Sequence, residues 1–215
     1  MAHAFRFRQG HFVTRLDSDE RALLIALMGQ VHRLVSRPVT PSTGDDFEDL
    51  MRGAGLADLS EATGRLHDDD LDDPGRDPAL DRLLPDAHRE DPLAAAEFRR
   101  MVAPGLRDRK AANLETAIAL LSADPTGKDS TEETDELLLD QDDAQALAMA
   151  LTDVRLVLGD RLDLRTDDDG DRLEQAVAED TLDEKTLELV MIYDFLTWLQ
   201  ESLSEALLHA LDDPT

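Results

Sequence analysis

Glu201, Glu205 and His209 recur at four-residue spacing, so on a helix they would share one face where carboxylates and an imidazole could exchange protons. That face is otherwise polar, and we interpret the three residues as a solvated stripe. Two acidic runs, His67–Asp70 and Asp167–Asp171, carry the oxygen atoms that cations prefer. The first consists of successive residues that do not converge on one point, and the second lacks the spacing and the final glutamate of a calcium loop. The sequence therefore predicts neither a metal site nor a cofactor.

The other residue types that often catalyse reactions lack the spacing that their mechanisms require. The six histidines form no HExxH motif, and no serine lies in a GxSxG motif. The pair Gly127-Lys128 has no glycine five residues upstream, as a phosphate-binding loop would need. The chain also has no cysteine, so it holds neither a disulfide nor a thiol redox switch. We therefore expect a protein that is not an enzyme.

Basic residues are the scarcer charge and gather in two segments. The chain has 22 Lys and Arg against 49 Asp and Glu, and its net charge is −27. A local positive field on such an acidic protein can steer an acidic protein partner. Together with two aromatic residues of the last predicted helix, these cations are the candidate partner-binding residues: Arg6, Arg8, Arg15, Arg99, Arg100, Arg107, Lys110, Tyr193 and Trp198.

Each group of candidates also has a purely structural interpretation. Arginines on a hairpin can serve only to keep a sheet face in water. Those of the second segment can pair with nearby acids such as Glu97 and Asp108. The two aromatic residues can be core residues with satisfied polar tips, and Asp194 can pair with Arg155.

The first arginines lie on a predicted β-hairpin over residues 4–16. A two-residue loop at Gln9-Gly10 pairs Arg8 with His11 and Phe7 with Phe12. The alternation then separates a core face, with Phe5, Phe7, Phe12 and Leu16, from a cationic face, with Arg6, Arg8, His11, Val13 and Arg15.

Helical periodicity predicts the elements that follow. A helix over residues 18–36 carries an apolar stripe, and residues 38–77 form an irregular acidic segment. Residues 78–122 form the central helical run, which starts a helix at Pro92 and should break or kink near Ala103, before Pro104.

The second half of the chain repeats the first strand-to-helix unit. Residues 137–159 form a strand-helix unit in which the segment from Leu139 aligns with the segment from Leu16. Leu137–Leu139 can therefore add a third strand to the hairpin, and Gly159 should end the helix. A capping box of Thr181 and Glu184 opens the last helix, residues 181–211. That helix is apolar nearly all round, which places it at the centre of the domain or against a second subunit in a homodimer.

These patterns predict a mainly α protein: a single helical domain, residues 1–215, with a small N-terminal antiparallel hairpin or three-stranded sheet. The hydrophobic content of 41% suffices for a core. No long uncharged apolar stretch and no signal-peptide h-region is present, so we expect a soluble cytoplasmic protein that does not enter a membrane. The strong negative charge argues against broad nucleic-acid binding.

Three blocks, Asp77–Leu121, Leu139–Leu164 and Tyr193–Leu208, resemble in order and spacing an actinobacterial family listed as a domain of unknown function, and the N-terminal FRFRQGHF extends the match. That family includes a protein named as an oxidative-stress transcriptional regulator. The resemblance implies a regulatory protein that binds an alternative sigma factor or RNA polymerase. Redox control in the characterised member is attributed to cysteines, which this chain lacks, so that switch is not implied here.

Two other functions remain open at this stage. Relatives are often encoded near a ClpS-type protease adaptor, which makes a Clp-associated proteostasis adaptor an alternative. The acidic composition also fits a nucleic-acid mimic that occupies a basic protein.

Overall fold

The computed structural model describes residues 2–36, 77–85, 92–123 and 136–212, without the side chains of residues 92–100 and of Asp167. The described residues from 2 to 36 and from 78 to 212 belong to one compact unit. The described residues contain six helices and one three-stranded antiparallel sheet, which confirms the predicted mainly helical class. The acidic segment 38–77, with its His67–Asp70 run, and the pair Gly127-Lys128 lie outside the described residues.

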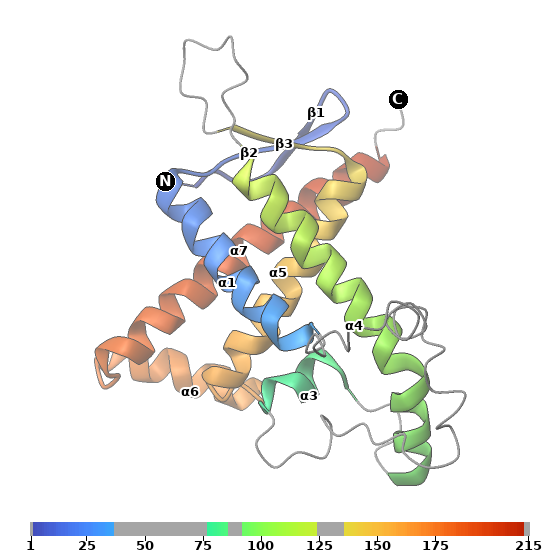
Figure 1. Ribbon diagram of the computed structural model, residues 1–215. Coiled ribbons are helices and arrows are strands. Elements are labelled where there is room, and N and C mark those ends of the chain that lie inside the picture. Colours follow the sequence, from blue (N-terminus) through green and yellow to red (C-terminus); the bar gives the residue numbers. More distant parts are fainter. Residues whose placement is uncertain (1, 37–76, 86–91, 124–135, 213–215) are drawn as a thin grey trace, which may run out of the picture. The chain divides into compact units, whose positions relative to one another are not determined.

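The sheet combines a local hairpin with a distant strand. β1 (Arg6–Arg8) and β2 (His11–Arg15) pair in the predicted register, and Gln9 and Gly10 both have positive φ, as a type I′ turn requires. β3 (Glu136–Leu139) pairs antiparallel with β2, which confirms the predicted third strand. In Figure 1 the sheet lies across one end of the helices. Its inner face buries Phe12 and Leu139 completely.

Helix α1 (Ser18–Val35) buries the predicted stripe of Leu24, Met28, Val31 and Val35. Its N-cap is Asp17. The Asp17 carboxylate accepts hydrogen bonds from the Asp19 and Glu20 amides, and these bonds lower the pKa of Asp17. The hydrophobic stripe is thus anchored to the end of β2.

Helices α3 (Ala79–Leu83) and α4 (Pro92–Ser122) form the predicted central run. Of the predicted break or kink near Ala103, the break does not occur, because α4 continues through Pro104. A proline inside a helix removes one hydrogen bond at a cost of about 3 kcal/mol. Ala103 and Arg107 on either side of Pro104 are buried, and the packing of this turn holds the helix through the proline.

Helix α5 (Gln141–Arg161) is the central element of the described unit. It packs against α1, α3, α4, α7 (Glu184–Asp212) and strands β2 and β3. Figure 1 shows α1 and α4 crossing in front of α5 and α7. Of the two placements predicted for the last helix, the centre of the unit is taken by α5, while α7 contacts α5 and the sheet and leaves Met191 and Leu208 exposed. The other placement, against a second subunit, stays a prediction.

The end of α5 also differs from the prediction. Gly159 lies inside the helix and is buried. The chain leaves the helix at Asp163, which has a positive φ of 55°. The Leu164 amide donates to the Gly159 carbonyl at 2.8 Å and the Asp163 amide to the Asp160 carbonyl at 3.1 Å, as in a Schellman motif.

Helix α6 (Asp167–Ala178) begins at the acidic run Asp167–Asp171, for which the sequence predicted no helix. It begins with a capping box, in which Asp169 accepts from the Thr166 amide at 2.7 Å and from the Thr166 hydroxyl at 2.8 Å. The predicted Thr181–Glu184 box is wrong, because Thr181 donates to the Ala176 carbonyl. Asp183 caps α7 instead, by accepting from the Thr186 amide at 3.1 Å.

Candidate partner-binding surface

The outward face of the sheet carries the first group of predicted cations. Arg6, Arg8 and Arg15 are exposed, while Phe12 and Thr14 of β2 are buried on the opposite face of the sheet. Strand pairing sets Arg6 opposite Val13 and Val13 opposite Leu138, so a short apolar row crosses the middle of this face. Leu138 is 57% exposed. We call these residues, Arg6, Arg8, Val13, Arg15 and Leu138, the cationic sheet face.

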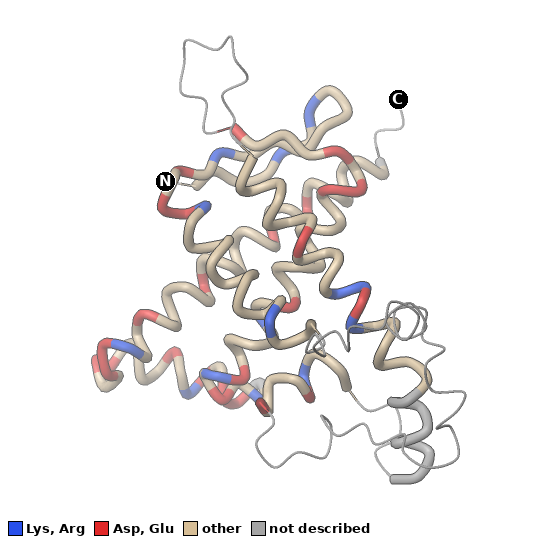
Figure 2. The backbone as a smooth tube through the Cα atoms, in the orientation of Figure 1, with Lys and Arg blue, Asp and Glu red and all other residues tan. Residues whose placement is uncertain are grey.

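The positive charges of this face are mostly free within the described residues. Arg15 lies 3.8 Å from Glu136, and both side chains are more than one-third exposed, so water screens this pair strongly. Arg6 and Arg8 make no ion pair with any other described residue. Figure 2 shows basic residues on the hairpin strands and acidic residues over much of the remaining chain. The face is shallow, with a depression of about 130 Å³ beside His3 and Thr14.

The inner side of the hairpin holds the arginines in a fixed frame. The Phe7 and Phe12 rings lie 5.0 Å apart between centroids, in a tilted arrangement. The Phe5 amide donates to the Ser202 hydroxyl of α7 at 3.2 Å, and the Thr14 hydroxyl donates to the His3 carbonyl. The strands that position the arginines are therefore tied to the helical unit on their buried side.

The second group of predicted cations does not join this surface. Arg107 is only 7% exposed, and its Nη2 atom has no hydrogen-bond partner in the described part of the chain. Lys110 pairs with Asp153 of α5, whose side chain is only 3% exposed. The structure therefore places Arg107 and Lys110 in internal positions. The side chains of Arg99 and Arg100 lie outside the described residues.

Burial controls the chemistry of the Lys110–Asp153 pair. Desolvation raises the pKa of the Asp153 carboxyl, and the hydrogen bond and positive charge of Lys110 oppose that rise. The pair links the middle of α4 to the middle of α5, so it has a structural role between two core helices.

Tyr193 and Trp198 lie on α7 at different depths. The Arg155 guanidinium stacks 5.2 Å from the centre of the Tyr193 ring and donates to the Gln200 side chain at 2.9 Å. The suggested pairing of Arg155 with Asp194 is thus not what the structure shows, and Asp194 is exposed. Trp198 is 39% exposed and stacks against Phe195 at 6.3 Å. Neither aromatic residue lines the depression of the cationic sheet face.

The chain matches over residues 2–207 a family model described as a domain of unknown function, DUF2017. It belongs to this family. No curated protein and no solved structure matches it. The matched range includes the whole sheet and α7 as far as Leu207, so the cationic sheet face is part of the DUF2017 domain.

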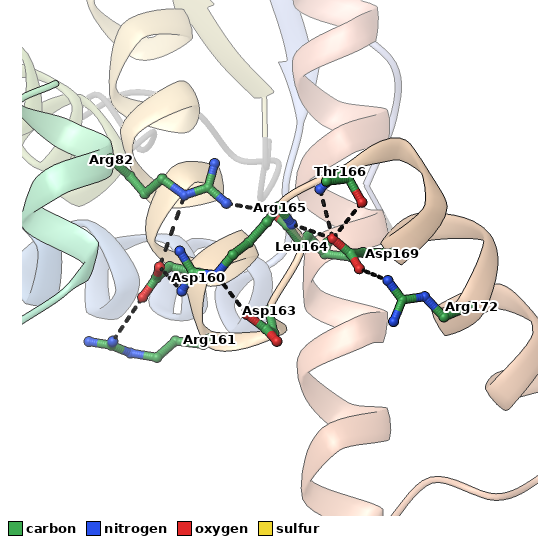
Figure 3. A network of polar contacts seen from close by, with 9 residues as sticks. All are labelled: Arg82, Asp160, Arg161, Asp163, Leu164, Arg165, Thr166, Asp169 and Arg172. Atoms are coloured by element: carbon green, nitrogen blue, oxygen red, sulfur yellow. Dashed lines mark hydrogen bonds and ion pairs between the residues drawn. The ribbon is translucent and has the colours of Figure 1, made fainter. Parts of the chain in front are cut away.

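A second polar cluster in the DUF2017 domain surrounds Asp160 at the end of α5 (Figure 3). Its nearly buried carboxylate accepts from Arg165 at 3.1 Å and lies 3.6 Å from Arg161 and 4.0 Å from Arg82 of α3. Arg82 also donates to the Leu164 carbonyl at 2.5 Å. The hydrogen bond to Asp163 and the charge of Asp160 raise the pKa of the Arg165 guanidinium. These contacts fasten α3 to the end of α5.

Two further observations concern sites that the sequence analysis considered. Glu201, Glu205 and His209 are all exposed, and the last two line a depression beside Arg6 and Phe7. Among the described residues, no three His, Cys, Asp or Glu side chains are close enough together to hold a metal ion. Nor does any described helix combine the length and apolarity that crossing a membrane demands.

Sequence reasoning missed one member of the cationic sheet face, Leu138. The three leucines Leu137–Leu139 read as a uniform apolar run, yet in a strand the middle one must point away from the other two. The period of two, applied to this short segment, would have found it. It also missed the groove between α5 and α7, because no local pattern indicates which faces of two distant helices remain uncovered.

Proposed function

We propose that this DUF2017 protein is a non-enzymatic regulatory protein that binds an acidic protein partner through the cationic sheet face. One observation carries the proposal: Arg6 and Arg8 are exposed and make no ion pair with another described residue, on a chain of net charge −27. A protein with so many acids could neutralise these arginines internally. Instead, their charge remains available to a partner.

The geometry of the face suits a carboxylate-rich surface. Arginine can bind a carboxylate through two parallel hydrogen bonds, and a rigid strand fixes the spacing between successive guanidinium groups. Val13 and Leu138 add apolar contact area in the middle of the face. Opposite charges at the rim accelerate association and select the partner, and the apolar row slows dissociation.

The resemblance to the oxidative-stress regulator suggests the partner: an alternative sigma factor or RNA polymerase, in the cytoplasm. Because the sequence contains no cysteine, oxidation of a thiol in this chain does not control the interaction. Regulation would then depend on the amount of protein or on a signal received by the partner.

The test is a binding titration of the full chain against purified RNA polymerase core and against sigma factors from the same organism. Replacing Arg6 and Arg8 by alanine removes two charges that make no ion pair within the described residues, and we expect affinity to fall at least about tenfold at low salt. The matched control is Arg33→Ala with Arg109→Ala, two exposed cations outside the sheet, which changes the net charge equally and should leave affinity within about twofold.

Normal folding of the Arg6/Arg8 variant, checked by circular dichroism, combined with parental affinity would refute the proposed surface. Recovery of Clp protease subunits instead of polymerase from a native lysate would support the proteostasis adaptor. The nucleic-acid mimic is favoured by the net charge of −27, and it makes the opposite prediction: removing arginines would leave binding to a basic partner intact or strengthen it.

A further inference from the structure

Helices α5 and α7 leave a groove of about 430 Å³ on the surface, separate from the cationic sheet face. The two helices run antiparallel: Gln200 of α7 donates to Thr152 of α5 at 2.8 Å, and Gln141 and Leu211 line the same groove further along (Figure 1). From Gln141 to Thr152 the groove follows about 17 Å of helix axis, which is about three turns. No residue that lines it is charged, although 33% of the chain is.

Large apolar side chains of this groove face solvent. Met149 is 56% exposed, Leu208 64% and Leu211 73%, and Ala148 and Leu207 complete the apolar lining. These three exposed residues come from two helices yet border one depression. Contiguous exposed apolar surface with this shape is typical of a binding site for another apolar surface.

The floor of the groove is held in place by hydrogen bonds. The Gln200 side chain donates to the Thr152 hydroxyl and accepts from Arg155 at 2.9 Å, so its position is set by α5 on both sides. Gln145 and Ser204 supply further uncharged polar groups in the lining. A fixed floor whose polar groups bond to one another lowers the ordering cost of binding, and the apolar residues of the lining supply contact area.

Acidic residues flank the apolar lining on both helices. Asp142 lies seven residues before Met149 on α5, and Glu201 lies seven residues before Leu208 on α7, so each shares a helix face with an exposed apolar residue. Both acids are exposed, as is Glu205 in the next turn of α7. A second copy of this chain would bring the same acids against each other, which disfavours self-association here.

We propose that the groove between α5 and α7 binds an amphipathic helix of a partner protein, with apolar residues on its inner side and lysines or arginines on its flanks. Helix-in-groove recognition uses anchors at i, i+3 or i+4 and i+7, and three turns of groove accommodate such a set. This inference does not rest on the proposed function, since the groove attracts a basic segment whereas the cationic sheet face attracts an acidic one.

The probe is a synthetic amidated helix of about 18 residues, with leucines at the anchor positions and lysines beside them. We expect it to bind the full-length protein, and we expect the same helix with glutamates in place of the lysines to bind at least about tenfold more weakly. The groove variant is Met149→Gln with Leu208→Gln, which keeps the net charge and should weaken binding of the basic helix at least about tenfold.

The matched control is Val177→Gln with Met191→Gln, which alters two exposed apolar residues of α6 and α7 outside the groove and should change affinity by less than about twofold. Equal binding of the basic helix to the parent and to a correctly folded groove variant would overturn the proposal, because attraction to the acidic surface alone would then explain it. Sedimentation showing a dimer that Leu208→Gln dissociates would also overturn it, by assigning the groove to a second copy.

Discussion

Asp153 and Lys110 show how one buried ion pair decides the position of two helices. A carboxylate removed from water is stable only when a cation and hydrogen bonds compensate it. Lys110 provides both from the neighbouring helix, and its side chain keeps 16% exposure. Lys110, which the sequence suggested as a partner-binding residue, thus pairs with Asp153 inside the protein.

Replacing Lys110 by methionine leaves Asp153 buried without its partner. We expect the free energy of unfolding at pH 7 to fall by about 3 kcal/mol, measured by urea denaturation. Adding Asp153→Leu should restore stability to within about 1 kcal/mol of the parent, because an apolar pair needs no compensation. If the single variant is as stable as the parent, the pair does not link α4 to α5 in solution.

The deficit of the Lys110→Met variant should depend on pH. Burial raises the pKa of Asp153 above its unfolded value, and removing Lys110 takes away the group that opposes this rise. When the pKa of a carboxyl group is higher in the folded state than in the unfolded state, the group contributes its full stability below the unfolded pKa. That contribution is lost as the pH rises through the folded pKa. The difference between parent and variant should therefore shrink as the pH is lowered from 7 toward 4.

At the scale of single residues, alternation along β1 and β2 predicted the exposed Arg6, Arg8 and Arg15 and the buried Phe5, Phe12 and Leu16, because successive side chains of a strand point to opposite faces. The interior position of Arg107 could not be predicted in this way. Arginine is usually exposed, so its residue type indicated the opposite. The burial of Arg107 follows from the packing of α4 against helices that are distant in the sequence.

At the scale of elements, Gly159 was expected to end α5 but lies within it. A Cβ added there would meet Tyr193 at 3.9 Å and Leu164 at 4.0 Å, which are ordinary contacts. Glycine inside a helix costs stability relative to alanine through its larger conformational freedom when unfolded. We expect Gly159→Ala to raise the free energy of unfolding by about 0.5–1 kcal/mol, measured by thermal denaturation.

Gly10→Ala is the contrasting control for this prediction. Gly10 has open space around it but a φ of 81°, which a residue with a Cβ adopts only with strain. This variant should be less stable than the parent, although it adds the same methyl group. Destabilisation by both substitutions would mean that the end of α5 lacks room for a side chain.

The elements that the sequence missed or misplaced are those with short or ambiguous start signals. The Thr166–Asp169 box that begins α6 is a recognisable motif, yet the acidic run around it resembled a solvated loop. The three-residue difference at the start of α7 arose because Asp183 and Thr181 are both good caps. No local sequence pattern indicated that helix α4 continues through Pro104.

At the scale of the whole molecule, a net charge of −27 opposes the compact state through self-repulsion. Salt shortens the screening length from about 10 Å at 0.1 M to about 3 Å at 1 M. We expect the thermal midpoint to rise with NaCl, with most of the rise complete by about 0.3 M, while binding at the cationic sheet face weakens over the same range.

A rise of the thermal midpoint that levels off by about 0.3 M NaCl indicates screening of charges. Exclusion of salt from the protein surface would instead continue to raise the midpoint at higher concentration. Parallel titrations of stability by circular dichroism and of partner binding by calorimetry would measure the two opposed effects. A midpoint that is insensitive to salt would show that the acids are already neutralised by neighbouring cations.

The pairing of β2 with β3 has a consequence for synthesis. The ribosome completes β2 at residue 15, whereas β3 begins at Glu136, and at about 5–20 residues per second the interval is roughly ten seconds. During that time the nascent chain carries the arginines without Leu138 and without the strand that flanks them. The complete cationic sheet face, with Leu138 beside the arginines, therefore exists only in chains translated beyond residue 139.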